Sequence, residues 1–431
     1  MMSVTAHPRT PAAELAVEIY RRTLDAVRAD RLVEVAVRRE GELLFVQDVP
    51  YDLSAYRRVL IAGVGKASTA MARSLGDTLG PHLSGGVVVT KRGFAEPLDR
   101  LEVLESSHPV PDESSLEAGR RLLDLANSCG PDDLVLFLLS GGASALAESP
   151  VEGVSLEDLQ VTNRALLASG ADITLMNAVR SKVSRLKAGG LARAFHPATV
   201  VALVLSDVVG NALGTIGSGP LIAPTRAALP FELLDVLPNS VRTEVLAGEL
   251  EEVATPKVPH HVVGSVSVAV HAAADAARRL GIEALPFQDP LQGEARDMAR
   301  QIMAVARRHA KANPKAEFCM VFGGETTVTL RGKGRGGRCQ EMALAAASSV
   351  ARLPNVAFLA AGTDGNDGPT EAAGGLVDRD SIALAQSKGV DARKALIDND
   401  SHRFLAASEG LVVTGPTGSN VNDICLVVQA S

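Results

Sequence analysis

The sequence of 431 residues lacks tryptophan entirely, and aromatic residues make up only 3% of it. Its four cysteines, Cys129, Cys319, Cys339 and Cys425, are far apart and form no C-x-x-C pair, which favours reduced thiols over a disulfide framework or a metal site. No apolar run reaches the roughly 18 residues that a membrane-spanning helix needs. The first residues also lack the apolar core of a signal peptide. We therefore expect a soluble, cytoplasmic protein that contacts no membrane.

The charge balance argues against a nucleic-acid-binding protein, because the formal net charge is −7. Clusters of cations must then be local features suited to small anions. Length predicts two domains, and 46% hydrophobic residues suffice for two large cores. The 39 glycines, together with alanine-rich helices, indicate an α/β protein with many strand-to-helix turns. We predict a first domain over residues 1–250 and a second, smaller domain over residues 251–431. Packing of the last segment of the chain on the first domain is left open.

A basic, glycine-rich loop spans residues 331–338. It carries Arg331, Lys333, Arg335 and Arg338. Upstream, residues 318–322 are apolar enough for a buried strand, Glu325 follows two glycines, and residues 327–330 alternate like a second strand. The loop leads into residues 340–344, the expected start of a helix. Glycines let backbone N–H groups face a ligand, a helix N-terminus attracts anions, and arginine binds them with two hydrogen bonds. The alternative is a solvated hairpin tip.

A second loop of this kind follows an apolar strand predicted for residues 58–64. The strand ends in Gly65 and Lys66 and leads into a helix, the outline of a phosphate-binding turn. It is not a P-loop, because Leu60 and Ala67 stand where that motif has a glycine and a hydroxyl residue. Nor does the next strand end in the acid with which a dinucleotide-binding site holds the ribose. For Lys66 the alternative is a solvated lysine at a helix start.

A third turn, of small residues, follows the apolar strand expected at residues 133–139. It comprises Ser140, Gly141, Gly142 and Ser144. Such a turn at a helix N-terminus suits a carboxylate or a phosphate. Parallel strands would place this turn and the Lys66 loop at the same edge of a sheet, where open α/β sheets bind ligands. Asp207, just after another buried strand, is the candidate Mg²⁺ ligand, with a helix cap or plain turn as the alternative.

Other polar positions have two readings each. His108 lies before a proline and is either a general base or a turn histidine satisfied by the backbone. Asp364, in an Asp/Asn/Gly loop, would hold Mg²⁺ or a ribose unless the loop is a plain turn. A helix expected at residues 173–188, ended by Gly189, has a polar face of cations. These are Arg180, Lys182, Arg185 and Lys187. A solvated face is the simpler reading, although one or two of them have the reach to bind a phosphate.

Taken together, at least five glycine-rich polar loops each cap an apolar strand. Phosphoryl transfer needs such a set: cations on the moving charge, an acid-held Mg²⁺, and backbone N–H groups that fix the geometry. The residues alone therefore predict a two-domain α/β enzyme that acts on a phosphorylated or otherwise anionic small molecule.

The order and wording of the loops resemble the glycerate 2-kinase family of the MOFRL type. The matching segments are GVGKA, SSHPVPD, LLSGGASAL, NAVRSKVSRLKAGGLA, LSDVVGNALGTIGSGP, GGETTV with GGRCQE, AAGTDGNDGPTEAAGG and TGPTGSNVND, and they cover nearly the whole chain. The resemblance implies a Rossmann-like, parallel-sheet N-terminal domain, a smaller α/β domain and an active site in the cleft between them. It also implies that ATP, with Mg²⁺, phosphorylates D-glycerate to 2-phosphoglycerate. The oligomeric state stays open, with a homodimer among the options.

By motif match, the resemblance assigns Lys66 and Arg338 as the key catalytic cations. Asp207, Glu325 and Asn420 would be supporting polar groups of the active site. The family usually has asparagine after this arginine, where the present chain has Cys339, so a contact at that position is in doubt.

The expected mechanism places the carboxylate of glycerate on the turn at residues 140–144 and on a cation. The 2-hydroxyl attacks the γ-phosphate in line while Lys66 and Arg338 neutralise developing charge, and Mg²⁺ near Asp207 bridges the phosphates. Gly65 and Asp364 are expected among the contacts to substrate or nucleotide. The acceptor of the hydroxyl proton is open between an aspartate and the phosphate itself.

Two rival functions remain. Members of the family are often labelled hydroxypyruvate reductase, and an NAD(P)H-dependent reductase is the runner-up. The second strand ends in Lys91 and Arg92, which disfavours NAD but tolerates NADP. A non-catalytic sensor of sugar acids is the other rival, although it would have little reason to carry acid and cation loops in both domains.

Overall fold

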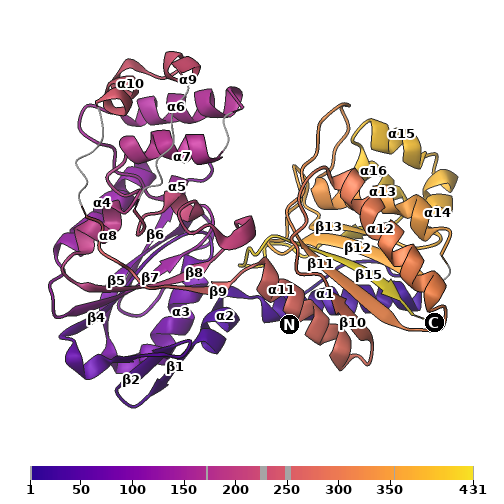
Figure 1. Cartoon of the computed structure of the whole chain (residues 1–431), viewed down its shortest axis with the longest axis horizontal. Helices are drawn as coiled ribbons and strands as arrows, with labels where there is room; N and C mark the ends of the chain where they lie inside the picture. The colour runs from indigo at the N-terminus through magenta and orange to yellow at the C-terminus, as the bar shows by residue number, and fades with distance from the viewer. Residues whose placement is uncertain (1, 171–172, 224–230, 248–253, 354, 431) are drawn as a thin grey trace. The chain divides into compact units, whose positions relative to one another are not determined.

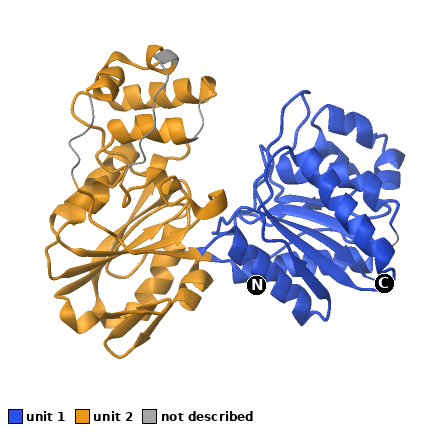
Figure 2. Cartoon of the chain, viewed as in Figure 1, with its two compact units in different colours: residues 1–28, 264–431 blue, residues 29–263 orange. Residues whose placement is uncertain are grey.

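The computed structural model describes residues 2–170, 173–223, 231–247, 254–353 and 355–430. The chain forms two compact units (Figure 2): Ala29–Val263, here the N-terminal unit, and Met1–Arg28 with Gly264–Ser431, here the C-terminal unit. This division differs from the predicted one, because the boundary lies after residue 263 rather than 250. The first helix, α1 (Pro11–Ala26), also belongs to the C-terminal unit, since its apolar face packs against the sheet of that unit.

The N-terminal unit is built on a six-stranded sheet. In spatial order its strands are β6 (Leu101–Ser106), β5 (Leu83–Lys91), β4 (Arg58–Val64), β7 (Asp133–Leu139), β8 (Thr199–Leu205) and β9 (His260–Gly264). The pairs β6–β5, β5–β4, β4–β7 and β7–β8 are parallel. From the central pair the chain builds outward in both directions, which is the Rossmann order. The predicted fold of this part is thereby confirmed.

Helices on this sheet explain why its strands are so apolar. They are α3 (Ser68–Leu79), α4 (Glu113–Asn127) and α8 (Gly190–Phe195), and α2 (Ala29–Ala36) packs in turn on α3 (Figure 1). A strand that is covered on both faces has no solvated side, so its residues do not alternate with polar ones. A small antiparallel sheet, β1 (Val37–Glu40), β2 (Leu43–Val46) and β3 (Val49–Asp52), adjoins α2 and α3.

A separate group of helices is visible in Figure 1 and has its own small core. It consists of α6 (Leu156–Ala168), α7 (Ile173–Lys182), α9 (Phe231–Asp235) and α10 (Asn239–Leu246). Val179 of α7, Leu166 of α6 and Val241 of α10 are fully or almost fully buried in this core. Neither these helices nor any other in the described ranges is long and apolar enough to cross a membrane.

The helix predicted for residues 173–188 is wrong in its second half, because α7 ends at Lys182. The chain then runs alongside residues 149–151: the N–H of Val151 donates to the carbonyl oxygen of Val183 (3.1 Å), and the N–H of Arg185 to that of Ser149 (2.8 Å). Gly189, with a φ of 77°, caps the start of α8 instead of ending α7. Local helical spacing gave no sign of this long-range pairing.

The C-terminal unit contains a second six-stranded sheet, of mixed direction. Its order is β10 (Glu283–Pro286), β11 (Phe318–Gly324), β15 (Asp423–Gln429), β12 (Val356–Gly362), β13 (Gly374–Val377) and β14 (Leu411–Val412). Strand β15 is antiparallel to both of its neighbours. Helices α1 and α11 (Val266–Arg279) pack on the sheet, as do α12 (Ala295–Ala312) and α13 (Arg338–Val350), while α14 (Ser381–Ser387), α15 (Ala392–Ile397) and α16 (Ser401–Ala407) pack around α13.

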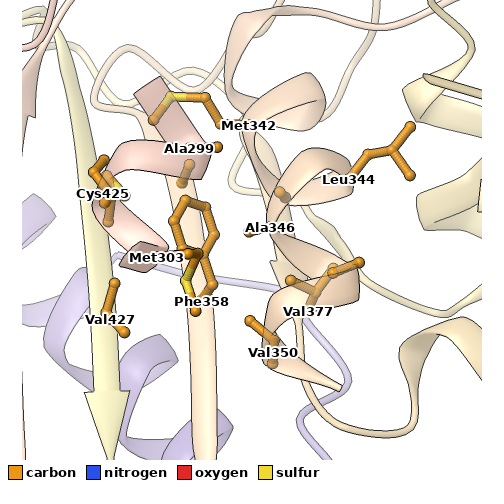
Figure 3. Packing of buried hydrophobic residues seen from close by; sticks show 14 of the residues in the cluster. Ala299, Met303, Met342, Leu344, Ala346, Val350, Phe358, Val377, Cys425 and Val427 are labelled. Carbon is orange, nitrogen blue, oxygen red and sulfur yellow. The ribbon is translucent and has the colours of Figure 1, made fainter. Parts of the chain in front are cut away.

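One hydrophobic core of this unit lies between the sheet and helices α12 and α13. Figure 3 shows Met303 of α12 and Met342 of α13 beside Phe358 and Val427 of the central strands. All four side chains are at most 2% exposed. The core therefore fixes α13, and with it the residue at the start of α13, Arg338.

Residues 327–330, predicted as the second strand of a hairpin, do not form a strand. Thr327 makes an isolated bridge to Glu294, and Thr329 donates its N–H (3.2 Å) and its hydroxyl (2.9 Å) to the carboxylate of Glu294. Strand β11 pairs instead with β15, from the end of the chain. Alternation predicted an extended segment but not its partner, and the place beside β11 was already taken.

Candidate active site

Two of the predicted loops meet where the strand order of the N-terminal unit reverses. Gly65 and Lys66 follow β4, and the turn at residues 140–144 follows β7. These strands are parallel neighbours in which Val64 pairs with Leu139, so both turns leave the same edge of the sheet. Open α/β sheets bind ligands at this switch point. Lys66 and the small-residue turn are therefore brought together.

The two turns are locked by contacts that only small residues permit. The N–H of Lys66 donates to the carbonyl oxygen of Gly141 (2.9 Å), and the N–H of Ala67 to the Oγ of Ser140 (3.1 Å). Gly65 has a φ of 142°, and a Cβ at this position would lie 2.1 Å from the Oγ of Ser140. Because this is far inside van der Waals contact, any other residue at position 65 would force the turns apart.

The side chains of Lys66 and His108 lie next to Gly142. A Cβ on Gly142, which precedes the short helix α5 (Ala143–Leu146), would lie 3.3 Å from the Cε of Lys66 and 3.0 Å from the Cδ2 of His108. Burial, reinforced by the positive charges of Lys66 and Lys91, lowers the pKa of His108 to about 4. His108 is thus neutral at neutral pH and a weak proton acceptor, which disfavours its reading as a general base.

Asp207, the candidate Mg²⁺ ligand, packs against the same turn. A Cβ on Gly141 would lie 2.0 Å from the Oδ2 of Asp207, so the carboxylate lies directly on this glycine. Among the residues that the structure describes, no group of three or more His, Cys, Asp or Glu side chains could hold a metal ion. Mg²⁺ at phosphate-binding sites commonly uses one or two carboxylates, with waters and phosphate oxygens as the other ligands. A single carboxylate at Asp207 fits this pattern.

Ser144 connects the turn to helix α7 through two residues that the sequence analysis missed. The Oγ of Ser144 lies 2.9 Å from the Oγ of Ser218, which donates to the Oδ1 of Asn177 (2.8 Å). Both residues lie in segments that carry the family resemblance. Because this chain of contacts joins three separate segments, no spacing in the sequence could have revealed it.

In the C-terminal unit, strand pairing gathers three acids. Asp423 at the start of β15 pairs with Gly324 at the end of β11 and with Gly362 at the end of β12. Glu325 and Asp364 follow these glycines directly or after one residue. A Cβ on Gly362 would lie 3.1 Å from the Oδ1 of Asp364 and 3.4 Å from that of Asp423. The predicted residues Glu325 and Asp364 therefore lie at one end of the sheet.

Arg338 is clamped between two of these carboxylates. Its Nε and Nη2 donate to Asp423 (2.6 and 3.1 Å), and its Nη1 donates to Glu325 (2.6 Å). Burial opposes the charge of Arg338, but the bonds and charges of Asp423, with that of Glu325, raise its pKa above the usual value. Asn422 donates its Nδ2 to Glu325 (3.2 Å) and its N–H to the Oδ1 of Asn420 (3.3 Å). Arg338 is thus always charged and held in one orientation.

Asp367 fixes the start of helix α13 just beside Arg338. Its carboxylate accepts the N–H groups of Cys339 (3.1 Å) and Gln340 (2.8 Å). It is only 3% exposed, and burial raises its pKa to about 6. A Cβ on Gly337 would lie 2.3 Å from the Cγ of Asp367, so this close approach also requires glycine. Asp367 therefore occupies the helix N-terminus that the sequence analysis expected a ligand to use.

The glycine-rich loop before Arg338 is likewise bound by the protein itself. The N–H groups of Arg331, Lys333 and Arg335 donate to side chains of Asn399 (2.7 Å), Asp398 (3.0 Å) and Asp400 (3.2 Å), respectively. The expectation that these N–H groups face an anion is wrong, because the turn before α16 takes them up. The side chains of the three cations are exposed.

Asp423 and Asp367 are the functional candidates that the sequence analysis missed. Asp423 ends the motif TGPTGSNVND, of which only Asn420 was singled out, and Asp367 lies three residues after Asp364. An acid that opens an otherwise apolar strand was the available signal for Asp423. For Asp367, the preference of helix N-termini for acids pointed to a partner but not to this one.

The chain matches two family models. Residues 15–246 match a domain of unknown function, DUF4147, and residues 318–423 match the MOFRL family. The chain is 40% identical to the D-glycerate 2-kinase of Thermotoga maritima, over 96% of this chain and 97% of that protein. It is 42% identical to an Agrobacterium vitis protein provisionally named hydroxypyruvate reductase, over 85% of this chain and 98% of that protein. The fold matches the crystal structure of glycerate kinase from Thermotoga maritima with a TM-score of 0.85 at 38% identity, over 97% of this chain and 99% of that one.

Proposed function

The chain belongs to the glycerate 2-kinase family of the MOFRL type, and we propose that it transfers the γ-phosphate of ATP to the 2-hydroxyl of D-glycerate. The products are 2-phosphoglycerate and ADP. The observation that carries this proposal is the pairing of Lys66 with a small-residue turn at the switch point of the parallel sheet. A lysine beside such a turn is a means of binding a phosphate or a carboxylate.

Lys66 and the turn at residues 140–144 neutralise and orient the anions of the substrates in the proposed reaction. Backbone N–H groups of the turn and the ammonium of Lys66 would act on oxygens that gain charge in the transition state. Removing one such donor typically costs about 100- to 1,000-fold in rate. The locked contacts of Gly65 and Ser140 suit this role, because donors that are already in place need no reorganisation during the reaction.

Arg338 supplies the second catalytic cation. Asp423 and Glu325 hold its guanidinium in one orientation, and a fixed planar fork suits the equatorial oxygens of a transferring phosphoryl group. Asp364 and Asn420 are proposed as further polar contacts around it. The interdomain cleft that the family resemblance implies stays a prediction.

Mg²⁺ is the metal that the residues at Asp207 would hold. When bound, it would act as a Lewis acid that lowers the negative charge repelling the attacking hydroxyl. Asp207 also lies against the turn, at Gly141, so its carboxylate is one candidate acceptor for the proton of the 2-hydroxyl. Direct transfer of this proton to the phosphate is the alternative. His108 is a poor third choice because of its low pKa.

The reductase alternative lacks a feature that dinucleotide binding needs. Strand β5 ends in Lys91 and is followed by Arg92, where a site for NAD would carry an acid on the ribose. Arg92 is moreover paired with Asp112 (2.7 Å), at the start of α4.

The test is D-glycerate-dependent consumption of ATP in the presence of Mg²⁺, with the position of the phosphate in the product read by NMR. The proposal predicts 2-phosphoglycerate. A parallel reaction with hydroxypyruvate and NADH or NADPH, followed at the nicotinamide absorbance, should show no turnover. Oxidation of either nicotinamide without any ATP-dependent product would overturn the proposal in favour of the reductase.

A further inference from the structure

We infer that Arg180 and Asn177 of helix α7 form the subsite that binds the carboxylate of D-glycerate. The inference rests on the proposed function and adds the residues that would distinguish a hydroxy acid from a neutral alcohol. Arg180 lies three positions after Asn177, so the two side chains are neighbours on the helix surface. From the sequence, Arg180 was predicted to lie on a solvated helix face, and Asn177 was assigned no role.

Asn177 offers a donor that lacks an acceptor. Its Oδ1 accepts from Ser218, whose Oγ also hydrogen-bonds to Ser144 of the small-residue turn. Its Nδ2 is buried and has no hydrogen-bond partner among the described residues. A buried donor without an acceptor is costly and rare in native proteins, so such a group calls for an explanation. A substrate oxygen on this side of the turn would satisfy it.

Arg180 offers the charge. Its Nε donates to the Oδ1 of Asn163 on helix α6 (2.9 Å), while its two terminal nitrogens, Nη1 and Nη2, make no hydrogen bond or ion pair with the residues that the structure describes. Burial lowers the pKa of Arg180, with Glu148 opposing the shift. An arginine nevertheless stays protonated in proteins. Two parallel donors on a partly buried guanidinium match the two oxygens of a carboxylate.

Glu148, the acid whose charge acts on Arg180, is already paired with other residues. It pairs with Lys187 and with the hydroxyl of Ser184, and it accepts the N–H of Ser149 (3.0 Å). Glu148 and Lys187 are each only 4% exposed. Since Lys187 neutralises Glu148, the positive charge of Arg180 remains available to an incoming anion.

Contacts on both sides place this pair near the anion-binding turn. On one side, Asn177 reaches Ser144 through a single serine. On the other side, Asn163 belongs to α6, whose Gln160 donates its Nε2 to the carbonyl oxygen of Pro111 (2.8 Å). Pro111 lies in the loop of His108, the ring of which lies next to Gly142. Hydrogen bonds thus connect α7 to the turn itself and α6 to the loop of His108, and Arg180 links the two helices through Asn163.

The test compares Arg180→Gln with a matched control, Arg164→Gln, in the D-glycerate-dependent ATPase assay. Arg164 is an exposed arginine of α6 with no hydrogen bond or ion pair to the described residues. For Arg180→Gln, the KM for D-glycerate should rise about 10- to 100-fold, because charge-assisted hydrogen bonds to the substrate are lost. The KM for ATP should stay unchanged. The KM of Arg180→Lys for D-glycerate should lie between those of the wild type and Arg180→Gln. Arg164→Gln should behave as the wild type.

A second variant keeps the test decisive if Arg180→Gln fails to fold. Asn177→Asp preserves size and the acceptor for Ser218 but places a negative charge opposite the substrate carboxylate, so it should raise the KM for D-glycerate at least as much. Folding of each variant is checked by circular dichroism. A wild-type KM for D-glycerate in folded Arg180→Gln or Asn177→Asp would overturn the inference. A wild-type enzyme without glycerate-dependent turnover would instead overturn the proposed function.

Discussion

Replacing Asp423 by asparagine should release Arg338 from its fixed orientation and slow phosphoryl transfer without unfolding the protein. Asp423 is 8% exposed and accepts two hydrogen bonds from Arg338, of 2.6 and 3.1 Å. Bonds to charged groups contribute about 1.5–3 kcal/mol, and neutral ones about half as much. Because the side chain of Arg338 is 34% exposed and water screens the pair, we expect a loss of stability near the low end, about 1 kcal/mol.

The effect on catalysis should be larger than the effect on stability. Asparagine keeps one acceptor but loses the charge and the second matched oxygen, so Arg338 would be free to rotate toward Glu325. Small displacements of a catalytic group cost about 100-fold in rate, and we expect a fall of this size in kcat. The assay is ATP consumption with saturating D-glycerate, alongside thermal unfolding monitored by circular dichroism.

The matched control is Glu371→Gln, which removes an exposed arginine–carboxylate pair of the same unit. Glu371 and Arg335 lie 3.3 Å apart, with side chains 73% and 54% exposed. Such a pair contributes at most about 1 kcal/mol, so stability and kcat should both stay near the wild-type values. If Asp423→Asn retained the wild-type kcat, the idea that this carboxylate positions Arg338 for catalysis would be refuted.

Two further predictions concern close contacts and pH. Gly65→Ala should destabilise the protein by about 1–3 kcal/mol in urea unfolding and raise the KM for ATP, because its Cβ would overlap Ser140. The control is Gly41→Ala, since Gly41 also has a positive φ but a Cβ there would have nothing within 4 Å. Equal losses of stability in both variants would argue against the clash with Ser140. Burial raises the pKa of Asp367 to about 6, above the unfolded value of about 3.9, so the folded state binds this proton more tightly. Stability should then fall as pH rises from about 4 to 6, by about 2–3 kcal/mol from this group, and Asp367→Asn should remove that part of the slope; a variant with the wild-type slope would contradict the assignment.

The N-terminal unit shows how far local pattern carries. The runs at residues 58–64, 133–139 and 199–205 are apolar after their first residue and are followed directly by glycine or serine, so strand, turn and sheet edge followed from the residues themselves. The placement of Lys66 beside the turn at residues 140–144 could therefore be predicted. Parallel neighbours need no further information to bring their ends together.

The C-terminal unit shows where local pattern stops. Asp423 reaches Arg338 only because β15 inserts between β11 and β12. Strands β11 and β15 pair although they lie far apart in the sequence, at residues 318–324 and 423–429. The same insertion displaced residues 327–330 from the hairpin expected for them. Likewise, α7 ends early because Val151 and Ser149 pair with the residues after it. In each case a long-range contact outweighed a local preference.

The central claim is that Lys66 stabilises the phosphoryl group in transfer, and the single-turnover rate of Lys66→Ala with D-glycerate and ATP tests it most directly. Single-turnover conditions separate the chemical step from product release. We expect a rate about 100- to 1,000-fold below that of the wild type, in a protein whose circular dichroism and unfolding midpoint are unchanged. A folded Lys66→Ala variant that phosphorylates D-glycerate at close to the wild-type rate would contradict it.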